Sequence, residues 1–397
     1  MKWYKEFVGI KSLFFFCSLP LRLDTYKGCP FGCRYCFSQQ LNNRDSQTFD
    51  KPIPANPAEI ENWFLRATTR QGTAGPVVSC VQRRVPFHIG CLSDPLQPLE
   101  RSVGVTHKII MLLQREQYPF VICTKSAMIA EDAYLELCTD APCSVQISFS
   151  TFNNDLAAII EPGAPSPNTR IRVLERLSTQ GIYTVARIQP FLYPIERLCE
   201  TDIRRLADAG VKHLVLEHLR IPTNSSKRTR NYLWEALGMD IISKYKRLGL
   251  KKSRISFELA SEAKLENVIL ARDIAHRYGM TFGSGDNDFH HFSDSFNCCG
   301  TPHTPHFANQ YSGHLGRAAW VACHTGALDF SYIDHEWHPN GSVREYLNSD
   351  CRIAGPNTVK DLLHDRIDNP YKSNSPTSFF GVRLEASGYY NFKLNIP

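Results

Sequence analysis

The feature that most constrains the fold is an alternation of short β-rich runs with amphipathic helical stretches from residue 20 to about residue 220. Gly181 and Gly210 stand where helix C-termini need a residue that tolerates positive φ. Six β-then-α units in succession predict a parallel sheet with right-handed crossovers. The predicted strands are 21–25, 86–91, 119–124, 145–150, 183–189 and 213–219, and the predicted helices are 57–68, 105–115, 131–138, 170–180 and 199–209.

Such a sheet is either doubly wound or closed into a full or partial barrel, and in both cases chemistry gathers at the C-terminal ends of the strands. The second half of the chain differs, with two predicted helices at 231–248 and 258–278 and no clear periodicity after residue 280. We therefore expect four parts: an N-terminal arm at 1–19, a core at 20–225, a helical segment with a Cys/His-containing loop at 226–299, and a C-terminal extension of unknown fold at 300–397.

The composition is that of an ordinary globular protein. Hydrophobic residues at 43% and charged residues at 21% exclude intrinsic disorder and collagen-like structure. The net charge of +6 permits a nucleic-acid partner without requiring one. Fourteen cysteines scattered through 397 residues do not resemble a disulfide-stapled scaffold, so we expect a reducing compartment, with some thiols reserved for metal.

The N-terminus faintly imitates a secretion signal, because Lys2 and Lys5 precede an apolar stretch at 13–16. Glu6 and Lys11 interrupt that pattern. No stretch approaches the roughly 18 apolar residues of a membrane span. We expect a buried strand or packing arm of a cytoplasmic protein with no membrane partner.

The most informative string is Cys29-Pro30-Phe31-Gly32-Cys33-Arg34-Tyr35-Cys36, directly after the first predicted strand. Three thiolates in eight residues can wrap one face of a four-iron cluster, and glycine and proline supply the tight turns. Three cysteines leave one iron of the cluster without a protein ligand. Such an open iron indicates a cluster that takes part in a reaction and does not only store an electron.

Two kinds of metal site and a chance grouping of structural thiols compete with this interpretation. A zinc site usually needs a second nearby pair of ligands, and a ferredoxin supplies a fourth cysteine in a similar run. The next forty residues offer neither. Structural thiols usually lie on an apolar face, whereas these flank glycine and proline in a loop. The context of strand and loop favours the open-iron cluster.

The cysteine spacing, with an aromatic residue before the last cysteine, resembles the signature of radical S-adenosylmethionine (SAM) enzymes. The resemblance implies a partial (β/α)6 TIM-type barrel with a C-terminal extension. It also implies that Cys29, Cys33 and Cys36 hold a [4Fe–4S] cluster whose open iron binds SAM. An electron from the cluster then cleaves SAM to methionine and a 5′-deoxyadenosyl radical, which abstracts hydrogen from a substrate. An external one-electron donor of the flavodoxin or ferredoxin type is implied as well.

Further strings resemble the spore photoproduct lyase-like branch of that superfamily, in the family's order over about residues 20–220. The strings are 90–100 (GCLSDPLQPLE), 123–126 (CTKS), 148–150 (SFS) and 161–166 (EPGAPS), with Arg170 just beyond. One departure concerns the Gly-Gly-Glu with which many superfamily members hold the SAM amino group. Here the corresponding residues are Leu92-Ser93-Asp94. The lyase-like branch is similar in this respect, so Ser93 and Asp94 are expected to hold the SAM amino group instead.

Several further residues are expected around SAM. A lysine and hydroxyls at strand ends suit the SAM carboxylate and ribose, although serines there also cap helices or satisfy loop amides. Arg187 lies late in the predicted strand 183–189. If that strand is buried on both faces, the charge of Arg187 either contacts SAM or forms an ion pair with Glu161 or Glu217. The expected cofactor-binding residues, besides Ser93 and Asp94, are Tyr35, Lys125, Ser126, Ser148, Ser150 and Arg187.

Cys91 is the expected catalytic residue. In spore photoproduct lyase a cysteine at the corresponding Cys-x-Ser/Thr-Asp position returns a hydrogen atom to the product radical, and Cys91 matches that place. The alternative is a small buried hydrophobe at the end of a core strand, which is common for free cysteine.

A second group runs from Asp286 to His291 and on to Cys298, Cys299, His303 and His306. One interpretation is an accessory iron–sulfur or zinc site, although adjacent cysteines rarely point the same way. The favoured alternative is a polar loop that closes over the barrel mouth and touches substrate. A structural loop stays open as a third, and a looser group at Cys323 and His324 with His335 and His338 is assigned no role.

The second half is locally basic, which suits a solvated helix face or a phosphate backbone. The basic residues are Lys227, Arg228, Arg230, Lys244, Lys246, Arg247, Lys251, Lys252 and Arg254. We expect a radical SAM enzyme with lyase-like chemistry, with a nucleic acid or nucleotide as its possible substrate. The alternative is a non-catalytic iron–sulfur protein acting in redox chemistry or nucleic-acid binding.

Overall fold

The computed structural model describes residues 2–11, 17–39, 49–72, 74–223, 233–252, 256–304, 307, 309–325, 330–339, 343–352, 354–368, 384–387 and 389–392. Its centre is an eight-stranded sheet in the order β1-β2-β5-β6-β7-β8-β9-β13. Only β1 runs antiparallel to its neighbour; the other pairs are parallel. The strands are β1 (Val8–Ile10), β2 (Leu21–Leu23), β5 (Phe87–Ile89), β6 (Phe120–Thr124), β7 (Cys143–Phe149), β8 (Tyr183–Phe191), β9 (His213–His218) and β13 (Thr281–Ser284).

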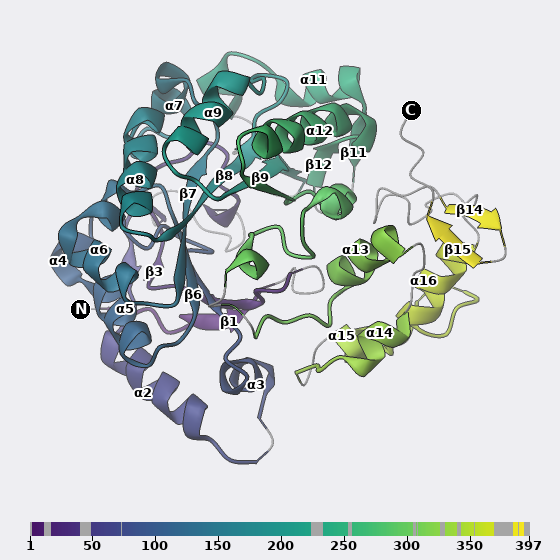
Figure 1. Ribbon diagram of the computed structural model, residues 1–397, viewed down its shortest axis with the longest axis horizontal. Helices are drawn as coiled ribbons and strands as arrows, with labels where there is room; N and C mark the ends of the chain where they lie inside the picture. Colours follow the sequence, from purple (N-terminus) through teal and green to yellow (C-terminus); the bar gives the residue numbers. More distant parts are fainter. Residues whose placement is uncertain are drawn as a thin grey trace.

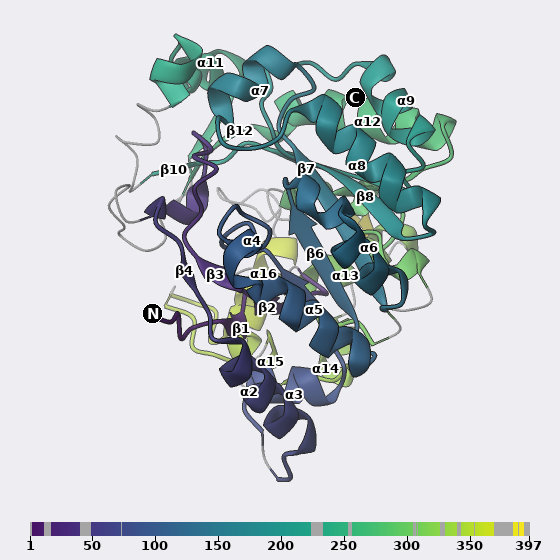
Figure 2. The same ribbon diagram turned by 90° about the vertical axis from the view of Figure 1, so that its left-hand side faces the viewer.

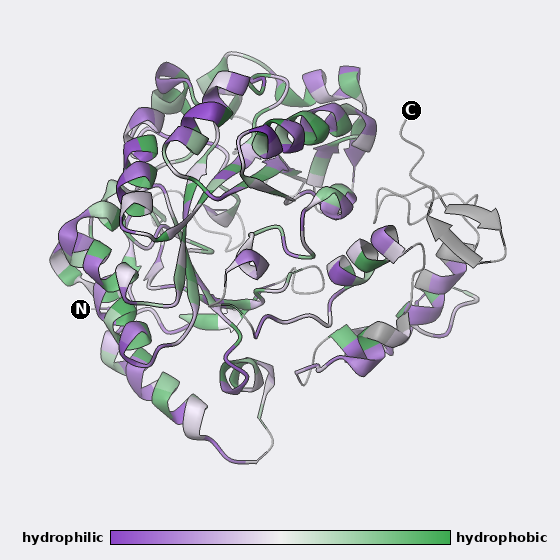
Figure 3. Ribbon diagram, in the orientation of Figure 1, coloured by the Kyte–Doolittle hydropathy of each residue, from purple (hydrophilic) through white to green (hydrophobic). Residues whose placement is uncertain are grey.

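Helices follow the parallel strands and cover the outer face of the sheet, as Figures 1 and 2 show. Their apolar sides pack on the strands in one continuous core, and Figure 3 shows hydrophobic and hydrophilic residues alternating along these helices. This is the architecture of a partial TIM-type barrel. The helices are α2 (Pro57–Thr69), α3 (Pro76–Gln82), α4 (Glu100–Val103), α5 (Val105–Arg115), α6 (Asp132–Thr139), α7 (Asn154–Ile160), α8 (Pro167–Thr179), α9 (Glu200–Asp208) and α12 (Ser261–Arg277).

All six predicted parallel strands are present, and the predicted barrel-type fold is confirmed. The N-terminal arm forms the edge strand β1, which ends at Ile10, and the following Lys11 N–H donates to the Pro20 carbonyl just before β2. One parallel strand was not predicted. β13 pairs with β9 beyond residue 225, and its four residues are followed at once by Gly285 and Asp286, which hide the strand pattern.

The predicted helix at 231–248 is wrong as a single element. Residues 231 and 232 lie outside the described residues, and a short helical stretch at 233–237 ends at Gly238, whose φ is +61°. Asp240 then caps a new helix by accepting from the Ile242 N–H at 3.0 Å. This helix is α11 (Ile241–Leu248), and it packs beside the small sheet of β10 (Ile221–Pro222), β11 (Leu250–Lys252) and β12 (Ser256–Leu259).

The C-terminal part carries further short elements on the opposite side of the sheet from α5, α6 and α8 (Figures 1 and 2). Its helix α13 (Leu315–Thr325) packs on residues 287–292 and so connects the C-terminal part to the barrel. The other elements are α14 (Phe330–His335), α15 (Val343–Leu347), α16 (Val359–Asp368), β14 (Leu384–Ser387) and β15 (Tyr389–Phe392).

The turn at Cys298–Gly300 closes the N-terminal end of the barrel. The Cys298 carbonyl lies 2.9 Å from Nε2 of His213 at the start of β9, and the Tyr183 hydroxyl donates to the Gly300 carbonyl at 3.1 Å. The expectation that this part of the loop covers the barrel mouth is therefore wrong, because the mouth lies at the opposite ends of these strands. Only residues 286–292 lie at the C-terminal end of β13. His306 lies outside the described residues, and the accessory metal site stays a prediction.

Replacing Gly283 with alanine tests this packing. A Cβ atom there would lie 2.3 Å from the Cys298 carbonyl oxygen, so the turn must move. We expect the mutation to cost about 1–3 kcal/mol of unfolding free energy, measured by urea denaturation. Gly75→Ala is the control, because a Cβ atom there meets nothing within 4 Å, and it should cost only about 0.5 kcal/mol through poorer helix capping. Equal losses in the two variants would contradict the placement of the turn.

Candidate functional site

The three cysteines of the predicted cluster lie in one loop that follows β3 (Tyr26–Lys27). The loop leaves the strand at Gly28, whose φ is +94° and where a Cβ atom would lie 2.5 Å from the Phe49 carbonyl oxygen. The same carbonyl accepts from the Cys29 N–H at 2.9 Å. Because only glycine tolerates both this φ and this contact, the turn that presents Cys29 depends on Gly28.

The opposite side of the cysteine loop rests on residues 160–163, between α7 and α8. The Gly163 N–H donates to the Phe31 carbonyl at 2.9 Å, and the Arg34 N–H donates to the Ile160 carbonyl at 2.8 Å. A Cβ atom on Gly163 would lie 2.8 Å from the Cα atom of Phe31. The Glu-Pro-Gly string is thus the second wall of the cysteine loop.

The donor set of this loop fits an iron–sulfur cluster. Cys29, Cys33 and Cys36 keep some accessible surface, and burial raises the pKa of all three thiols, that of Cys33 to about 12. They are therefore neutral thiols at pH 7, and binding to iron would deprotonate them. A site that favours the neutral thiol in the absence of metal suits a cofactor that arrives with its own positive charge.

A buried carboxylate, that of Glu161, joins the cysteine loop to the strands. The Tyr35 hydroxyl donates to it, as does the Ser150 hydroxyl at 2.9 Å. Arg170 lies 2.5 Å away, and the Lys125 ammonium lies 3.8 Å away. Burial opposes ionisation of Glu161, but Lys125 and Arg170 outweigh it, so the pKa of Glu161 is lowered. Glu161 is therefore an ionised carboxylate that lies between two cations beside the cysteines.

Ser93 and Asp94 tie the end of β5 to its neighbours. The Ser93 hydroxyl donates to the Tyr26 carbonyl at 2.6 Å. Asp94 accepts from the Thr124 hydroxyl at 2.7 Å and from the Lys125 N–H at 2.8 Å. Both side chains therefore fix the geometry of the strand ends next to the cysteine loop, and their contact with SAM stays a prediction.

The remaining predicted SAM residues fall into two groups. Ser126 caps the short helix that follows β6 by accepting from the Met128 N–H at 3.2 Å, and Ser150 contacts Glu161. Ser148 and Arg187 lie side by side in the register of β7 and β8. Arg187 forms no ion pair with Glu161 or Glu217 within the described residues, and its guanidinium contacts Gln146 and lies 3.9 Å from the Cys299 sulfur.

Cys91 lies just beyond β5 and keeps some accessible surface. Its thiol donates to the His88 carbonyl at 3.3 Å, and burial raises its pKa to about 12. It is therefore a protonated thiol, which is the form that can give up a hydrogen atom.

Sequence reasoning missed several polar residues on the inner face of the sheet, among them Lys11, His88 and Gln146, and it named Glu217 only as a possible ion-pair partner. Burial raises the pKa of Glu217 to about 7. A signal was present, because residues 144, 146, 148 and 150 place a polar side chain at every second position of an otherwise apolar strand. That period assigns them all to one face.

A charged network lies where β9 and β13 end. Asp286 accepts from the His218 N–H and lies 3.3 Å from the ammonium of Lys264, which also contacts Asp288. These buried groups compensate one another, so the network has a structural explanation.

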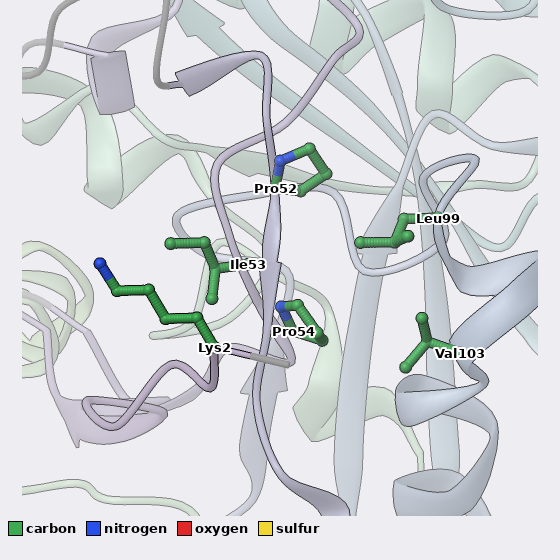
Figure 4. A pocket seen from close by; sticks show the side chains of 6 residues that line it. All are labelled: Lys2, Pro52, Ile53, Pro54, Leu99 and Val103. Atoms are coloured by element: carbon green, nitrogen blue, oxygen red, sulfur yellow. The ribbon is translucent and has the colours of Figure 1, made fainter.

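The surface hollow in Figure 4, of about 270 Å³, lies elsewhere. Its lining is mainly apolar and includes no predicted site residue. The lining residues are Lys2, Pro52, Ile53, Pro54, Leu99 and Val103.

Of the basic residues expected at a nucleic-acid surface, four lie outside the described residues. Lys246 and Arg247 are exposed on α11, and Lys251 lies 3.7 Å from Asp288, which partly neutralises it. The side chain of Cys323, from the looser group of cysteine and histidine residues to which we assign no role, also lies outside the described part of the structure. The four residues outside are Lys227, Arg228, Arg230 and Arg254.

Replacing Gly163 with alanine tests the second wall of the cysteine loop. The added methyl group collides with the backbone of residues 30 and 31, so we expect the reconstituted protein to retain less than about half of the wild-type iron, with a stability loss of about 1–3 kcal/mol. Gly181→Ala is the control, because its positive φ costs about 1 kcal/mol with no contact near the loop. Full iron retention by Gly163→Ala at matched stability would contradict this role.

Among the described residues, no helix has the length and apolar character that crossing a membrane requires. Residues 23–196 match the family model of the radical SAM superfamily. An uncharacterized protein of Mycobacterium tuberculosis is 25% identical over 245 residues, 58% of this chain and 68% of the relative. An uncharacterized protein of Acidianus two-tailed virus is 29% identical over 222 residues, 54% of this chain and 71% of the relative.

The fold is similar to that of spore photoproduct lyase. The structure of that enzyme complexed with dinucleoside spore photoproduct aligns with a TM-score of 0.52 at 15% identity, over 70% of this chain and 79% of the other. The predicted resemblance to the lyase-like branch is thus confirmed in the fold. The family match spans β2 to β8 and includes the cysteine loop, so this part of the chain is similar to the radical SAM superfamily.

Proposed function

We propose that this chain is an enzyme that binds a [4Fe–4S] cluster through Cys29, Cys33 and Cys36 and cleaves SAM. The observation that carries the proposal is the cysteine loop, which is held on one side by Phe49 and on the other by Gly163. When bound, the cluster supplies the electron that cleaves SAM to methionine and a 5′-deoxyadenosyl radical.

The residues of this chain position and shield that chemistry. The Lys125 ammonium lies 3.8 Å from Glu161, whereas Arg170 lies 2.5 Å from it, so Lys125 is the cation that suits the SAM carboxylate. Tyr35 aligns the end of the cysteine loop through Glu161. The other proposed SAM contacts are Ser93, Asp94, Ser126, Ser148 and Ser150. The predicted SAM contact of Arg187 is set aside, because its guanidinium contacts Gln146 and lies 3.9 Å from the Cys299 sulfur.

We propose further that the reaction is lyase-like and that the substrate is a nucleic acid or nucleotide. Support comes from the fold likeness to spore photoproduct lyase. It also comes from Cys91, a protonated thiol beside the inner face of the sheet that suits the return of a hydrogen atom to a product radical.

An external one-electron donor of the flavodoxin or ferredoxin type, in the cytoplasm, completes the proposal. The described cysteines are all free thiols, which supports a reducing compartment.

Anaerobic reconstitution with iron and sulfide tests the enzyme class. We expect about four irons per chain and, after reduction with dithionite, formation of 5′-deoxyadenosine and methionine from SAM. Cys33→Ala should lose the cluster and lower cleavage at least about tenfold, because one of the three proposed iron ligands is missing. Cys199→Ala, at an exposed position, is the control and should keep both.

Two other outcomes decide against parts of this proposal. Retained four-iron absorbance in Cys33→Ala would show that the ligand assignment is wrong. An intact cluster whose spectrum SAM does not perturb, and which yields no cleavage, would favour the alternative of a non-catalytic iron–sulfur protein.

Dinucleoside spore photoproduct tests the reaction type. We expect the wild-type protein to convert it to repaired dinucleoside, and Cys91→Ala to cleave SAM while repair falls at least about tenfold, because the hydrogen donor is missing. Product analysis by chromatography and mass spectrometry measures both. If the wild-type protein cleaves SAM and leaves the photoproduct unchanged, the lyase assignment is wrong and the enzyme class stands.

A further inference from the structure

The inner face of the barrel is polar, which is unusual for this architecture. In TIM-type barrels the inward positions are mostly bulky aliphatic residues that fill the interior. Here the strand register places polar side chains next to one another on that face, with Cys123 beside Gln146 and Ser148 beside Arg187. Several inner residues in or next to the strands of the sheet keep accessible surface, so side chains do not fill all of the space between them. These residues are Lys11, Cys91, Cys123, Arg187, Gln189 and Glu217.

Two cations on this inner face have no carboxylate partner. Within the described part of the chain, no carboxylate lies within 4.0 Å of Lys11 or Arg187. The nearby Asp24 is paired with Arg22 at 2.5 Å, and Glu217 lies 3.5 Å from Arg220. A buried cation without a counter-charge is costly, so its presence calls for an explanation.

The two side chains that accept hydrogen bonds from these cations each keep an unsatisfied donor. The Lys11 ammonium contacts Nδ1 of His88, and because an ammonium cannot accept, Nδ1 accepts and Nε2 carries the proton. The Arg187 guanidinium likewise donates to Oε1 of Gln146 at 3.1 Å, which leaves the amide nitrogen as a donor. Both His88 Nε2 and Gln146 Nε2 are buried without a partner, in side chains that are 6% and 0% exposed.

The side chains of Lys11, His88, Gln146 and Arg187 lie close to one another. Arg187 lies close enough to Lys11 and His88 to act electrostatically on both, and together with burial it lowers the pKa of His88. His88 is therefore neutral, with its one proton on Nε2. Two positive charges with unsatisfied donors beside them are complementary to an anion, which only accepts hydrogen bonds.

We infer that Lys11, His88, Gln146 and Arg187 form an anion site that binds a carboxylate or phosphate group of the substrate. The inference rests on the proposed function and adds the chemical class of the substrate to it. Cys91 lies next to the site, because its thiol contacts the His88 carbonyl at 3.3 Å and its charge neighbours include Lys11. An anionic group held here anchors the substrate with its reacting part beside Cys91.

An internal counter-ion is the main alternative. The Cys299 sulfur lies 3.9 Å from both the Cys298 sulfur and the Arg187 guanidinium. The hydrogen bond from Cys298 and the charge of Arg187 lower the pKa of Cys299. A Cys299 thiolate would compensate one cation. It would also accept a hydrogen bond from the side chain of Gln146. It would leave a second positive charge and the His88 donor without an acceptor, so the thiolate alone does not complete the site.

Anion titration of the reconstituted full-length protein tests the inference. Sodium phosphate and sodium acetate are the two probes, each exchanged against sodium chloride at constant ionic strength. We expect one of them to raise the melting temperature saturably by several degrees. Stabilisation by phosphate would identify a phosphorylated substrate, and stabilisation by acetate would identify a substrate with a carboxylate. In Lys11→Met and Arg187→Met the apparent affinity for that anion should fall at least about tenfold.

Stability without added anion gives an independent measure. Arg187→Met removes an uncompensated charge, so we expect its melting temperature in chloride to equal or exceed that of the wild type. Arg170→Met is the matched control, because Arg170 is buried and paired with Glu161, and its loss should lower the melting temperature. If Arg187→Met does not fold, Lys11→Met carries the anion titration alone.

The inference is overturned if neither anion stabilises the wild type, or if the variants respond to the anion as the wild type does. A fall in melting temperature for Arg187→Met as large as that for Arg170→Met would assign the counter-charge to Cys299 instead. SAM cleavage is assayed on the same preparation. Cleavage without an anion response contradicts only this inference, and an anion response without cleavage contradicts only the proposed function.

Discussion

The buried carboxylate of Glu161 is the interaction on which the site depends. It accepts from Tyr35 in the cysteine loop and from Ser150 at the end of β7, and it lies against Lys125 from the end of β6 and Arg170 from α8. One side chain thus fixes the positions of two strand ends, a helix and the loop. Removing it would leave two buried cations unpaired, which is far more costly than the loss of an exposed ion pair.

The cysteine loop adds a second constraint, which is steric. Gly28 and Gly163 allow the backbone of residues 29–34 to approach two other segments more closely than any side chain permits. Because the contacts are between backbones, they fix the path of the loop without using the thiols. The cysteines stay available to a cluster, and the loop that carries them is already positioned before the cluster binds.

The sequence predicts the barrel well because its evidence is local. Each of the six predicted strands is an apolar run followed by an amphipathic helix, and Gly181 and Gly210 mark helix ends with positive φ. β13 escaped because Gly285 and Asp286 cut its pattern short. The helix at 231–248 was wrong because apolar periodicity continues across Gly238, where the backbone does not.

The residues of the candidate site also differ in whether the local sequence predicts them. The cysteines, Lys125 and Glu161 lie in contiguous strings whose spacing can be compared with a family. Lys11, His88 and Arg187 lie in three distant segments, and nothing in the local sequence says that their charges meet.

The path of residues 293–300 also depends on long-range packing. The Asp294 N–H donates to the Phe282 carbonyl, and the turn that follows fits against Gly283. Loop composition predicts an irregular segment, but it does not say at which end of the barrel the segment lies.

The two ends of the barrel are electrostatically different, and that difference orders the proposed chemistry. Near the cysteine loop, cations face a carboxylate that is already ionised, so the local charge is largely compensated before any cofactor binds. Deeper inside, Lys11 and Arg187 have no such partner in the described structure. A ligand that carries its own negative charge is therefore held most strongly below Cys91, and the region between Cys91 and the cysteine loop remains for the part of the substrate that reacts. The polar inner strands serve this arrangement, since aliphatic side chains would have filled the same space.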